Sequence, residues 1–552
     1  MRIFYRLFLL TLFVLVVDFP VLASQNFYFR LNQLGFLPED IKTAVIMSRQ
    51  NLSGKKYEIV EQTGKKVILS SILNNGIQGA GNFSFNYVID FSSIRKPGKF
   101  FISCEGRKSS IFSIGGNIYD SIADSLLLFF KVQRCGYTNP LLHGVCHPAD
   151  ATRIINKDGP ENNKIDVTGG WHDAGDYVKF LNTTAFTTYL LLFSYEFDPV
   201  KFGFDSDKNG IPDILEEAKI GLDWLLRANV NDNRFITQVQ DLRDHDQGWR
   251  MPEKDQLAFD RPGFTGTGKN LTGIYTAVMS LASRIWKEKL QYNEFADKCL
   301  NTAIKVYSLR SKVPDLDKSG TGMYQDSKYA GKLALGAVEL YQSTKQREYL
   351  ADAIGYADQA KSDFWWSWGD INSLADYKIA KYEPRFKDYI FNNLKLFNDT
   401  KNKNVFGEAA GDSWGSNNAV LGCALQAILW KKLTGNNSFD SLTVYQRDFI
   451  LGKNQWGISF IYNIGTSFSK NFHSQISFFK RGYLPGAVAA GPISRKKLES
   501  YKIEMSGKDP LKQFQTEAAV YQDIRTDYVT NEPTITTNAT AVFVFGYFSG
   551  KR

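Results

Sequence analysis

The sequence predicts two domains of different class, a small β-sandwich followed by a large, mostly helical domain. Apolar residues alternate with a period of two from about residue 26 to 114, as in half-buried strands. After about residue 119 they recur at helical spacing. The length of 552 residues also exceeds an average domain of roughly 150 residues. We expect a signal peptide at 1–23, the sandwich at 24–117 and the helical domain at 118–552.

The composition excludes several classes of protein. Hydrophobic residues make up 43% and charged residues 22%, which fits a globular protein and excludes a disordered or collagen-like chain. The formal charge of +9 is small for this length, and no cluster of Lys and Arg indicates a nucleic-acid partner. Five cysteines are too few for a disulfide scaffold.

The first residues have the pattern of a secretory signal. Arg2 and Arg6 precede the eleven-residue apolar run Leu7–Val17, and Val21-Leu22-Ala23 offers a cleavage site. The run is shorter than the ~20 residues that span a bilayer, although an uncleaved anchor is the alternative. No later segment is long and apolar enough to span a membrane. We therefore expect a secreted or periplasmic protein.

The sandwich is predicted from short strands separated by turns. Lys56–Val60 and Lys66–Leu69 flank Thr63-Gly64, which is a hairpin signal. Further strands are expected at Phe85–Phe91, Lys99–Ser103 and Ser110–Ile114. This spacing is typical of a β-sandwich of about 90 residues. It carries no ligand motif, so its expected role is structural.

The helical domain is predicted from apolar residues at i, i+3, i+4 and i+7. The pattern is clearest from Ile211 to Leu226, where Pro212 lies at a position that a first helical turn tolerates. It recurs at Ile274–Ile285, Leu333–Leu340 and Val420–Leu433. Long loops rich in Asn, Gly and Pro separate these helices, and such loops often carry functional groups.

Two loop segments contain candidate catalytic carboxylates. Gly169–Tyr177 places Asp173 and Asp176 three residues apart among glycines, which let the backbone approach a ligand closely. Paired carboxylates can hold and deprotonate a water molecule, although an Asx-rich turn explains this segment equally well. Glu532 precedes Pro533, where a loop ends before the last apolar segment; a single Glu in a loop is usually solvated.

Together these segments resemble family 9 of the glycoside hydrolases, cellulases with an N-terminal immunoglobulin-like domain. The resemblance covers nearly the whole mature chain and implies a multidomain fold in which an Ig-like β-sandwich precedes a large all-α (α/α) six-hairpin barrel. Further matching segments are Arg30–Phe36, Asn209–Ala218, Asp244-His245 with Trp249, Pro252 and Glu253, Trp414–Asn417, Ile450–Asn454, Leu484–Gly486 and Gly491-Pro492.

The resemblance also implies roles for individual residues. Asp176 matches the catalytic base of an inverting hydrolase, Asp173 a carboxylate that positions the water, and Glu532 the general acid. An acid in this role needs a raised pKa, and an inverting pair needs ~6.5–9.5 Å between its carboxyl groups. Trp249 and His473 are the expected substrate-binding residues.

Two departures from the family pattern concern the substrate. Gln475 stands where the family usually has an Arg, and Ile493 where it usually has an Asn. We expect a secreted, endo-acting hydrolase of β-1,4-glucosidic bonds in cellulose or a related β-glucan. Alternatives are an exo-acting β-glucosidase or glucosaminidase, a xyloglucan or mixed-linkage glucanase, and an inactive carbohydrate-binding protein.

Four residues form a candidate zinc site: Cys135, Cys146, His147 and His172. Two thiolates and two imidazoles suit tetrahedral zinc, although their spacing is not that of a compact finger. The alternatives are a disulfide between the two cysteines, because export favours it, and a solvated His147. The resemblance implies a structural zinc at the matching residues, which would fix the base-bearing loop through His172.

A second candidate metal site reads D-x-D-x-N-G-x-x-D-x-x-E, which resembles a calcium loop. The alternative is an Asx-rich turn that caps the following helix. The expected structural calcium ligands are Asp205, Asp207, Asn209, Ile211 (through its carbonyl), Asp213 and Glu216.

The remaining cysteines and a tryptophan cluster are expected to be structural. Cys104, Cys299 and Cys423 are predicted to be isolated and buried, as small hydrophobic residues. The aromatic cluster at 365–368 could form a sugar-stacking platform, but aromatic clusters are more often core, and we favour the core.

Overall fold

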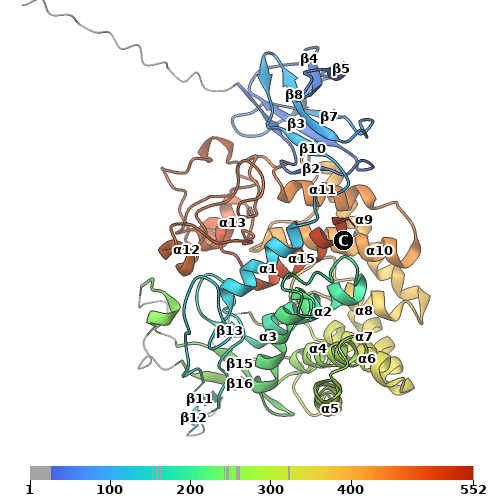
Figure 1. Cartoon of the computed structure of the whole chain (residues 1–552), viewed down its shortest axis with the longest axis vertical. Coiled ribbons are helices and arrows are strands. Elements are labelled where there is room, and N and C mark those ends of the chain that lie inside the picture. Colours follow the sequence, from blue (N-terminus) through green and yellow to red (C-terminus); the bar gives the residue numbers. More distant parts are fainter. Residues whose placement is uncertain are drawn as a thin grey trace, which may run out of the picture.

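The computed structural model describes residues 26–550, apart from 152, 157–158, 162–164, 242, 244–247, 256–260 and 321–323. The predicted signal peptide therefore lies outside the described residues, as do Asp244 and His245. Figure 1 shows the β-domain at one end of the molecule and the large helical domain below it.

The N-terminal domain is the predicted sandwich of two sheets. One sheet has the strand order β1-β3-β7-β6, and the other has the order β2-β10-β8-β4-β5 with β9 paired to β8. The predicted hairpin is confirmed, because β4 and β5 pair antiparallel. The strands are β1 (Phe27–Arg30), β2 (Gly35–Phe36), β3 (Thr43–Ser48), β4 (Lys56–Glu61), β5 (Val67–Ile72), β6 (Ile77–Gln78), β7 (Phe85–Asp90), β8 (Gly98–Cys104), β9 (Arg107–Lys108) and β10 (Phe112–Ile114).

Six helices form the inner layer of the second domain. Each contacts the next in chain order, and the last contacts the first, so the six make a ring. Helices in this position are covered on all sides, which explains why several are apolar around their whole circumference. They are α2 (Leu181–Phe197), α4 (Lys269–Glu288), α6 (Ala330–Thr344), α8 (Asn372–Ile379), α10 (Ser416–Thr434) and α15 (Ile535–Phe548).

An outer layer of helices covers this ring. Each outer helix packs on an inner one: α1 on α15, α3 on α2, α5 on α4, α7 on α6, α9 on α8 and α10, and α11 on α10. Within the described ranges, no helix combines the length and apolarity needed to cross a bilayer. The outer helices are α1 (Ile122–Gln133), α3 (Asp213–Ala228), α5 (Asn293–Ser308), α7 (Arg347–Ala360), α9 (Lys387–Lys403) and α11 (Asp440–Ile450). Short helices in the loops are α12 (Gln475–Phe479), α13 (Arg495–Ser500) and α14 (Tyr528–Asn531).

A small sheet inside the helical domain was not predicted. Its strand order is β12-β11-β16-β15-β13, with β14 paired to β15. Most of these strands are only two to four residues long, too short to show alternation in the sequence. The strands are β11 (Ile154–Asn156), β12 (Gly159–Glu161), β13 (Lys179–Phe180), β14 (Asn229–Asn231), β15 (Arg234–Val239) and β16 (Gly263–Gly266). Strand β13 follows the Asp173 segment directly and ties it to the rest of the domain.

The two domains are joined by buried polar contacts from the segment Arg30–Phe36. The Asn32 side-chain amide donates to the Tyr119 hydroxyl at 2.9 Å and to Asp448 Oδ1 at 2.8 Å. Its own oxygen accepts from the backbone N–H groups of Leu34 and Gly35. The first two hydrogen bonds hold the loop between β1 and β2 against the helical domain, and the other two fix the conformation of the loop.

Nearby charges are paired across the same interface. Arg447 is fully buried, and its guanidinium lies 2.9 Å from Asp40 and 2.7 Å from Asp448. A buried charge is tolerated where it is paired, so this surface of the helical domain depends on Asp40 from the sandwich.

Asn32→Ala should lower the free energy of unfolding by about 2 kcal/mol, because it leaves buried partners such as Asp448 short of a donor. Thermal unfolding of the full chain measures the effect. The exposed Asn74→Ala is the matched control and should stay within about 0.5 kcal/mol of the wild type. Equal melting temperatures for the two variants would contradict this account of the interface.

Candidate active site

The three candidate carboxylates line one cavity of about 370 Å³. Asp173 and Asp176 come from the loop before β13, and Glu532 comes from the loop before α15. The predicted substrate-binding residues Trp249 and His473 line the same cavity. Its other lining residues are Ala174, Gly175, Phe180, Gly248, Tyr324, Gln475 and Tyr528.

Backbone hydrogen bonds fix the loop that carries Asp173. Its N–H donates to the Val178 carbonyl at 2.8 Å, which closes a tight loop around Asp176. Its carbonyl accepts from the N–H of Ile535, the first residue of α15, at 3.0 Å. The loop is thus joined to the segment that carries Glu532, although the two are far apart in sequence.

Gly175 lies at the closest approach of these two segments. Its N–H donates to Glu532 Oε1 at 3.0 Å. A Cβ at this position would lie 1.9 Å from the His473 carbonyl oxygen and 3.1 Å from Glu532 Oε1. Only glycine leaves room for both neighbours, so this residue type is required here.

The carboxyl groups affect one another electrostatically. Burial raises the pKa of Glu532 well above its usual value, and the nearby Asp176 and Asp173 raise it further. Burial also raises the pKa of Asp173 to about 7, while a hydrogen bond from Thr183 opposes the shift. Asp176 is only half-buried. The site therefore holds a deeply buried Glu that favours its protonated form and a more exposed Asp beside it.

One wall of the cavity is aromatic. The ring centroids of Trp249 and His473 are 5.2 Å apart and their planes are perpendicular. His473 Nδ1 lies 2.7 Å from the Arg525 carbonyl oxygen, which can only accept, so this nitrogen carries a proton. The hydrogen bond sets the orientation of the imidazole at the cavity.

Gln475 connects two loops of this wall. Its backbone N–H donates to the Gly175 carbonyl at 3.0 Å, and its side-chain oxygen accepts from the Arg250 N–H at 3.0 Å. The Arg250 carbonyl in turn accepts from the Tyr177 hydroxyl. The Gln475 side chain thus holds the loop segment next to Trp249, because its oxygen accepts a hydrogen bond from the backbone of Arg250.

The four predicted zinc ligands lie together and are buried. Sγ of Cys135 and Sγ of Cys146 are 3.8 Å apart, and both cysteines are free thiols, so this structure does not contain the alternative disulfide. His172 Nε2 lies 3.4 Å from His147 Nδ1 and 3.8 Å from Cys146 Sγ, and His147 Nδ1 lies 3.7 Å from Cys135 Sγ.

These distances match the edges of a tetrahedron. Zinc bonds of about 2.3 Å to sulfur and about 2.0 Å to nitrogen place two sulfurs about 3.8 Å apart and two nitrogens about 3.3 Å apart. Burial lowers the pKa of His172 to about 3, which keeps the imidazole in the neutral form that binds metal. The donor set and its geometry therefore fit a four-coordinate metal ion.

A partner shell around this cluster was not predicted from the sequence. His147 Nε2 lies 2.9 Å from Asp255 Oδ2, an arrangement common for metal-binding histidines. Asp255 also accepts two hydrogen bonds from the Arg250 guanidinium, at 2.7 and 2.8 Å. Asp255 and Arg250 stand alone in a loop, and nothing in the sequence around them signals this role.

The predicted calcium loop brings part of its ligand set together. Carboxylate oxygens of Asp205, Asp207 and Asp213 lie within 4.8 Å of one another. The Asn209 side-chain amide donates to Glu216 at 2.6 Å and to Asp207 at 3.2 Å. Ile211, the remaining predicted ligand, donates its N–H to the Asn209 side-chain oxygen.

The other residues expected to be structural are largely buried. Cys104, Cys299 and Cys423 are free and buried, as predicted. In the tryptophan cluster, Trp366 is buried in the core, while Trp365 and Trp368 are half-buried and pack against it.

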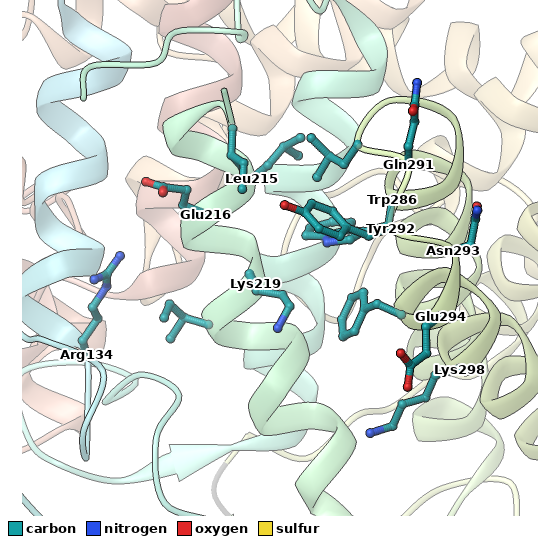
Figure 2. Close-up of a pocket in the computed structure, with 14 residues that line it drawn as sticks. Arg134, Leu215, Glu216, Lys219, Trp286, Gln291, Tyr292, Asn293, Glu294 and Lys298 are labelled. Carbon is teal, nitrogen blue, oxygen red and sulfur yellow. The ribbon is translucent and has the colours of Figure 1, made fainter. Parts of the chain in front are cut away.

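A second cavity, of about 870 Å³, lies away from these carboxylates. Figure 2 shows it between helix α3, which contributes Leu215, Glu216 and Lys219, and the start of α5, with Trp286 and Tyr292 at its centre. It shares no residue with the Glu532 cavity.

Comparison with known families identifies the fold and the chemistry. The model of glycosyl hydrolase family 9 matches residues 119–545, and that of the cellulase N-terminal ig-like domain matches residues 25–109. The chain belongs to glycosyl hydrolase family 9. The predicted resemblance is confirmed, and the family 9 chain is a glycoside hydrolase.

Several curated relatives of this family 9 chain are glucanases. An endoglucanase D from Acetivibrio thermocellus is 24% identical over 95% of this chain and 84% of its own length. A cellodextrinase from Butyrivibrio fibrisolvens is 26% identical over 93% of this chain and 98% of its own. A xyloglucan-specific endo-beta-1,4-glucanase from Bacteroides ovatus is 25% identical, covering 93% and 92%.

Solved family 9 structures share the fold. A metagenome-derived family 9 endoglucanase superposes with a TM-score of 0.80 at 25% identity, covering 95% of this chain and 99% of that one. A zinc-binding triple mutant of a family 9 endoglucanase has a TM-score of 0.80 at 23% identity, covering 94% and 100%.

Glu532→Gln should stabilise the protein at neutral and alkaline pH. The pKa of Glu532 in the folded protein lies above its unfolded value of about 4.3. Its contribution to the free energy of unfolding is therefore fully present below about pH 4.3 and is lost as the pH rises through the folded pKa. The variant should therefore melt higher than the wild type at pH 8 and by less at pH 4.5. The exposed Glu499→Gln serves as control, and a Glu532→Gln difference that does not grow with pH would refute the raised pKa.

Proposed function

We propose that this family 9 hydrolase is exported through residues 1–23 and cleaves cellulose or a related β-glucan within the chain, with inversion at the anomeric carbon. One observation carries the proposal. Asp176 and Glu532, from opposite ends of the helical domain, line the same cavity, and the environment of Glu532 favours its protonated form.

In the proposed reaction Glu532 is the general acid. Its protonated carboxyl donates to the oxygen of the leaving sugar, and burial keeps it protonated at the pH where Asp176 is needed as a base. The N–H of Gly175 holds Glu532 Oε1 in place and can stabilise the carboxylate formed when the proton leaves.

Asp176 and Asp173 act on the attacking water. Asp176, the more exposed of the two, accepts a proton from a water molecule on the opposite face of the sugar. Asp173 is held by Thr183 through Oδ1, and the Tyr324 hydroxyl also interacts with its carboxyl group. Its buried Oδ2 can accept a hydrogen bond from the water and orient it.

The aromatic wall supports sugar binding. Trp249 offers an apolar ring to the face of a pyranose, and the imidazole of His473 lies against it. Relatives named for cellodextrins and for xyloglucan show that the family accommodates several β-glucans. Assays on carboxymethyl cellulose, xyloglucan, mixed-linkage glucan and chitosan oligomers, with viscosity compared to reducing-sugar release, test the substrate and endo action.

Two metal ions complete the proposal, and both are structural. Zinc bound by Cys135, Cys146, His147 and His172 would have no open position, so it would stabilise the loop instead of activating water. Calcium at Asp205, Asp207 and Asp213 would stabilise the turn before α3.

Asp176→Asn and Glu532→Gln should each lower kcat about 10²–10⁴-fold on the best glucan, the usual contribution of general acid–base catalysis. Circular dichroism should show both variants folded. Proton NMR of the first product should show the inverted α-anomer with the wild type. Near-normal turnover by either folded variant would remove the role assigned to that residue, and a β-anomeric first product would exclude inversion.

The purified protein should contain one zinc ion per chain by elemental analysis, and chelation should lower its melting temperature. Cys135→Ser should lose the metal, whereas Cys104→Ser, in the sandwich, should keep it. A bound calcium ion would appear in the same measurement. A metal-free protein with Cys135 and Cys146 joined in a disulfide would refute the zinc site.

A further inference from the structure

Arg525 has an unpaired guanidinium beside the catalytic cavity. The side chain is half-buried, and in the described part of the chain it forms no ion pair and no side-chain hydrogen bond. Its Nε is covered by protein and still has no acceptor. Burying a charged donor without a partner is unfavourable, so this position needs an explanation other than fold stability.

The backbone of Arg525 fixes its place relative to the cavity. Its carbonyl oxygen accepts the Nδ1 proton of His473, which lines the cavity. Tyr528, three residues later, lines the cavity as well, and Glu532 follows in the same segment. The guanidinium is therefore attached to the wall that also carries the candidate acid.

Exposed aromatic rings continue this wall outward. Phe478 on α12 meets Trp249 edge-to-face, with ring centroids 5.4 Å apart, and is 44% exposed. The neighbouring Phe479 is 43% exposed and lies 5.0 Å from it. The Arg525 guanidinium lies over the Phe478 ring, 5.3 Å from its centroid. Large apolar rings left in solvent next to a ligand cavity mark a binding surface.

We propose that Arg525 and Phe478 form a further sugar-binding position, next to Trp249, for a pyranose unit of a glucan chain that extends out of the catalytic cavity. This inference rests on the proposed function. A pyranose offers an apolar C–H face for the Phe478 ring and hydroxyl oxygens as acceptors for the guanidinium. A neutral polysaccharide supplies both the apolar face and the hydroxyl acceptors, whereas a purely apolar ligand would leave the guanidinium without an acceptor.

The chemistry at Gln475 supports this assignment. The Gln475 side chain is uncharged, and its oxygen accepts a hydrogen bond from the Arg250 N–H. Gln475 therefore offers no charged hydrogen-bond donor on this wall. Arg525, whose backbone carbonyl contacts His473, places its guanidinium over Phe478, the ring that packs against Trp249. The substrate class that gains from it is a β-glucan long enough to pass Trp249.

Arg525→Gln and Phe478→Ala test the proposal through the dependence of hydrolysis on chain length. With cello-oligosaccharides of increasing length, each variant should lose about tenfold in kcat/KM for long substrates relative to short ones, mainly through a higher KM. A loss of about tenfold corresponds to one charge-assisted hydrogen bond or one stacked ring. Arg525→Lys should recover part of the loss.

Controls separate this position from a structural role. Arg347→Gln on α7 and Phe391→Ala on α9 change exposed residues of the same types elsewhere and should leave the length dependence unchanged. An equal loss on short and long substrates, or a length dependence identical to that of the wild type, would overturn the proposal.

Binding to an inactive variant separates a failure of the proposed function from a failure of the additional sugar-binding position. In Glu532→Gln, calorimetry with a long cello-oligosaccharide should show about tenfold weaker binding when Arg525→Gln is added. If the wild type hydrolyses no glucan, the proposed function fails. If the wild type is active but Arg525→Gln does not weaken binding to the Glu532→Gln variant, only the additional sugar-binding position is refuted.

Discussion

The candidate site depends on two consecutive residues that face different partners. His172 contributes Nε2 to the Cys–His cluster, and Asp173 lines the cavity of the candidate carboxylates. Since neighbouring Cα atoms are 3.8 Å apart, the position of one residue fixes the other closely. Gln133 holds the same stretch from behind, because its side-chain amide donates to the carbonyls of His172 and Ala174. Whatever orders the cluster also orders the carboxylates.

A second connection runs along the opposite side of the loop. From His147 it passes to Asp255, to the Arg250 guanidinium, and through the Arg250 N–H to Gln475. Gln475 then holds Gly175, whose N–H contacts Glu532. A metal ion in the cluster would thus be coupled to Glu532, the proposed acid, as well as to the loop of Asp176, the proposed base, although it would contact neither carboxyl group. The helices hold these loops in position, and the loops carry the candidate carboxylates.

The sequence could predict what repeats along the chain. Strand alternation located the sandwich hairpin, and helical periodicity located helices such as α3 and α10. That Asp173 and Asp176 share a site with Glu532 came from the family resemblance, since no local pattern encodes it. The hydrogen bond between Gly175 and Glu532, 357 residues apart, was not predicted. Single loop residues such as Asp255 and Arg525 gave no signal, because their roles arise only from neighbours that folding brings together.

The sandwich is more than an appendage to the catalytic domain. Asn32 and Asp40 satisfy Tyr119, Arg447 and Asp448, all of which belong to the helical domain and lie in its buried interface. A truncated enzyme that begins after the sandwich would expose this patch and leave the Arg447–Asp448 pair without Asp40 and Asn32. Engineers who wish to exchange the N-terminal module should therefore transplant these residues with it, since the hydrolase cannot be excised cleanly at the domain boundary.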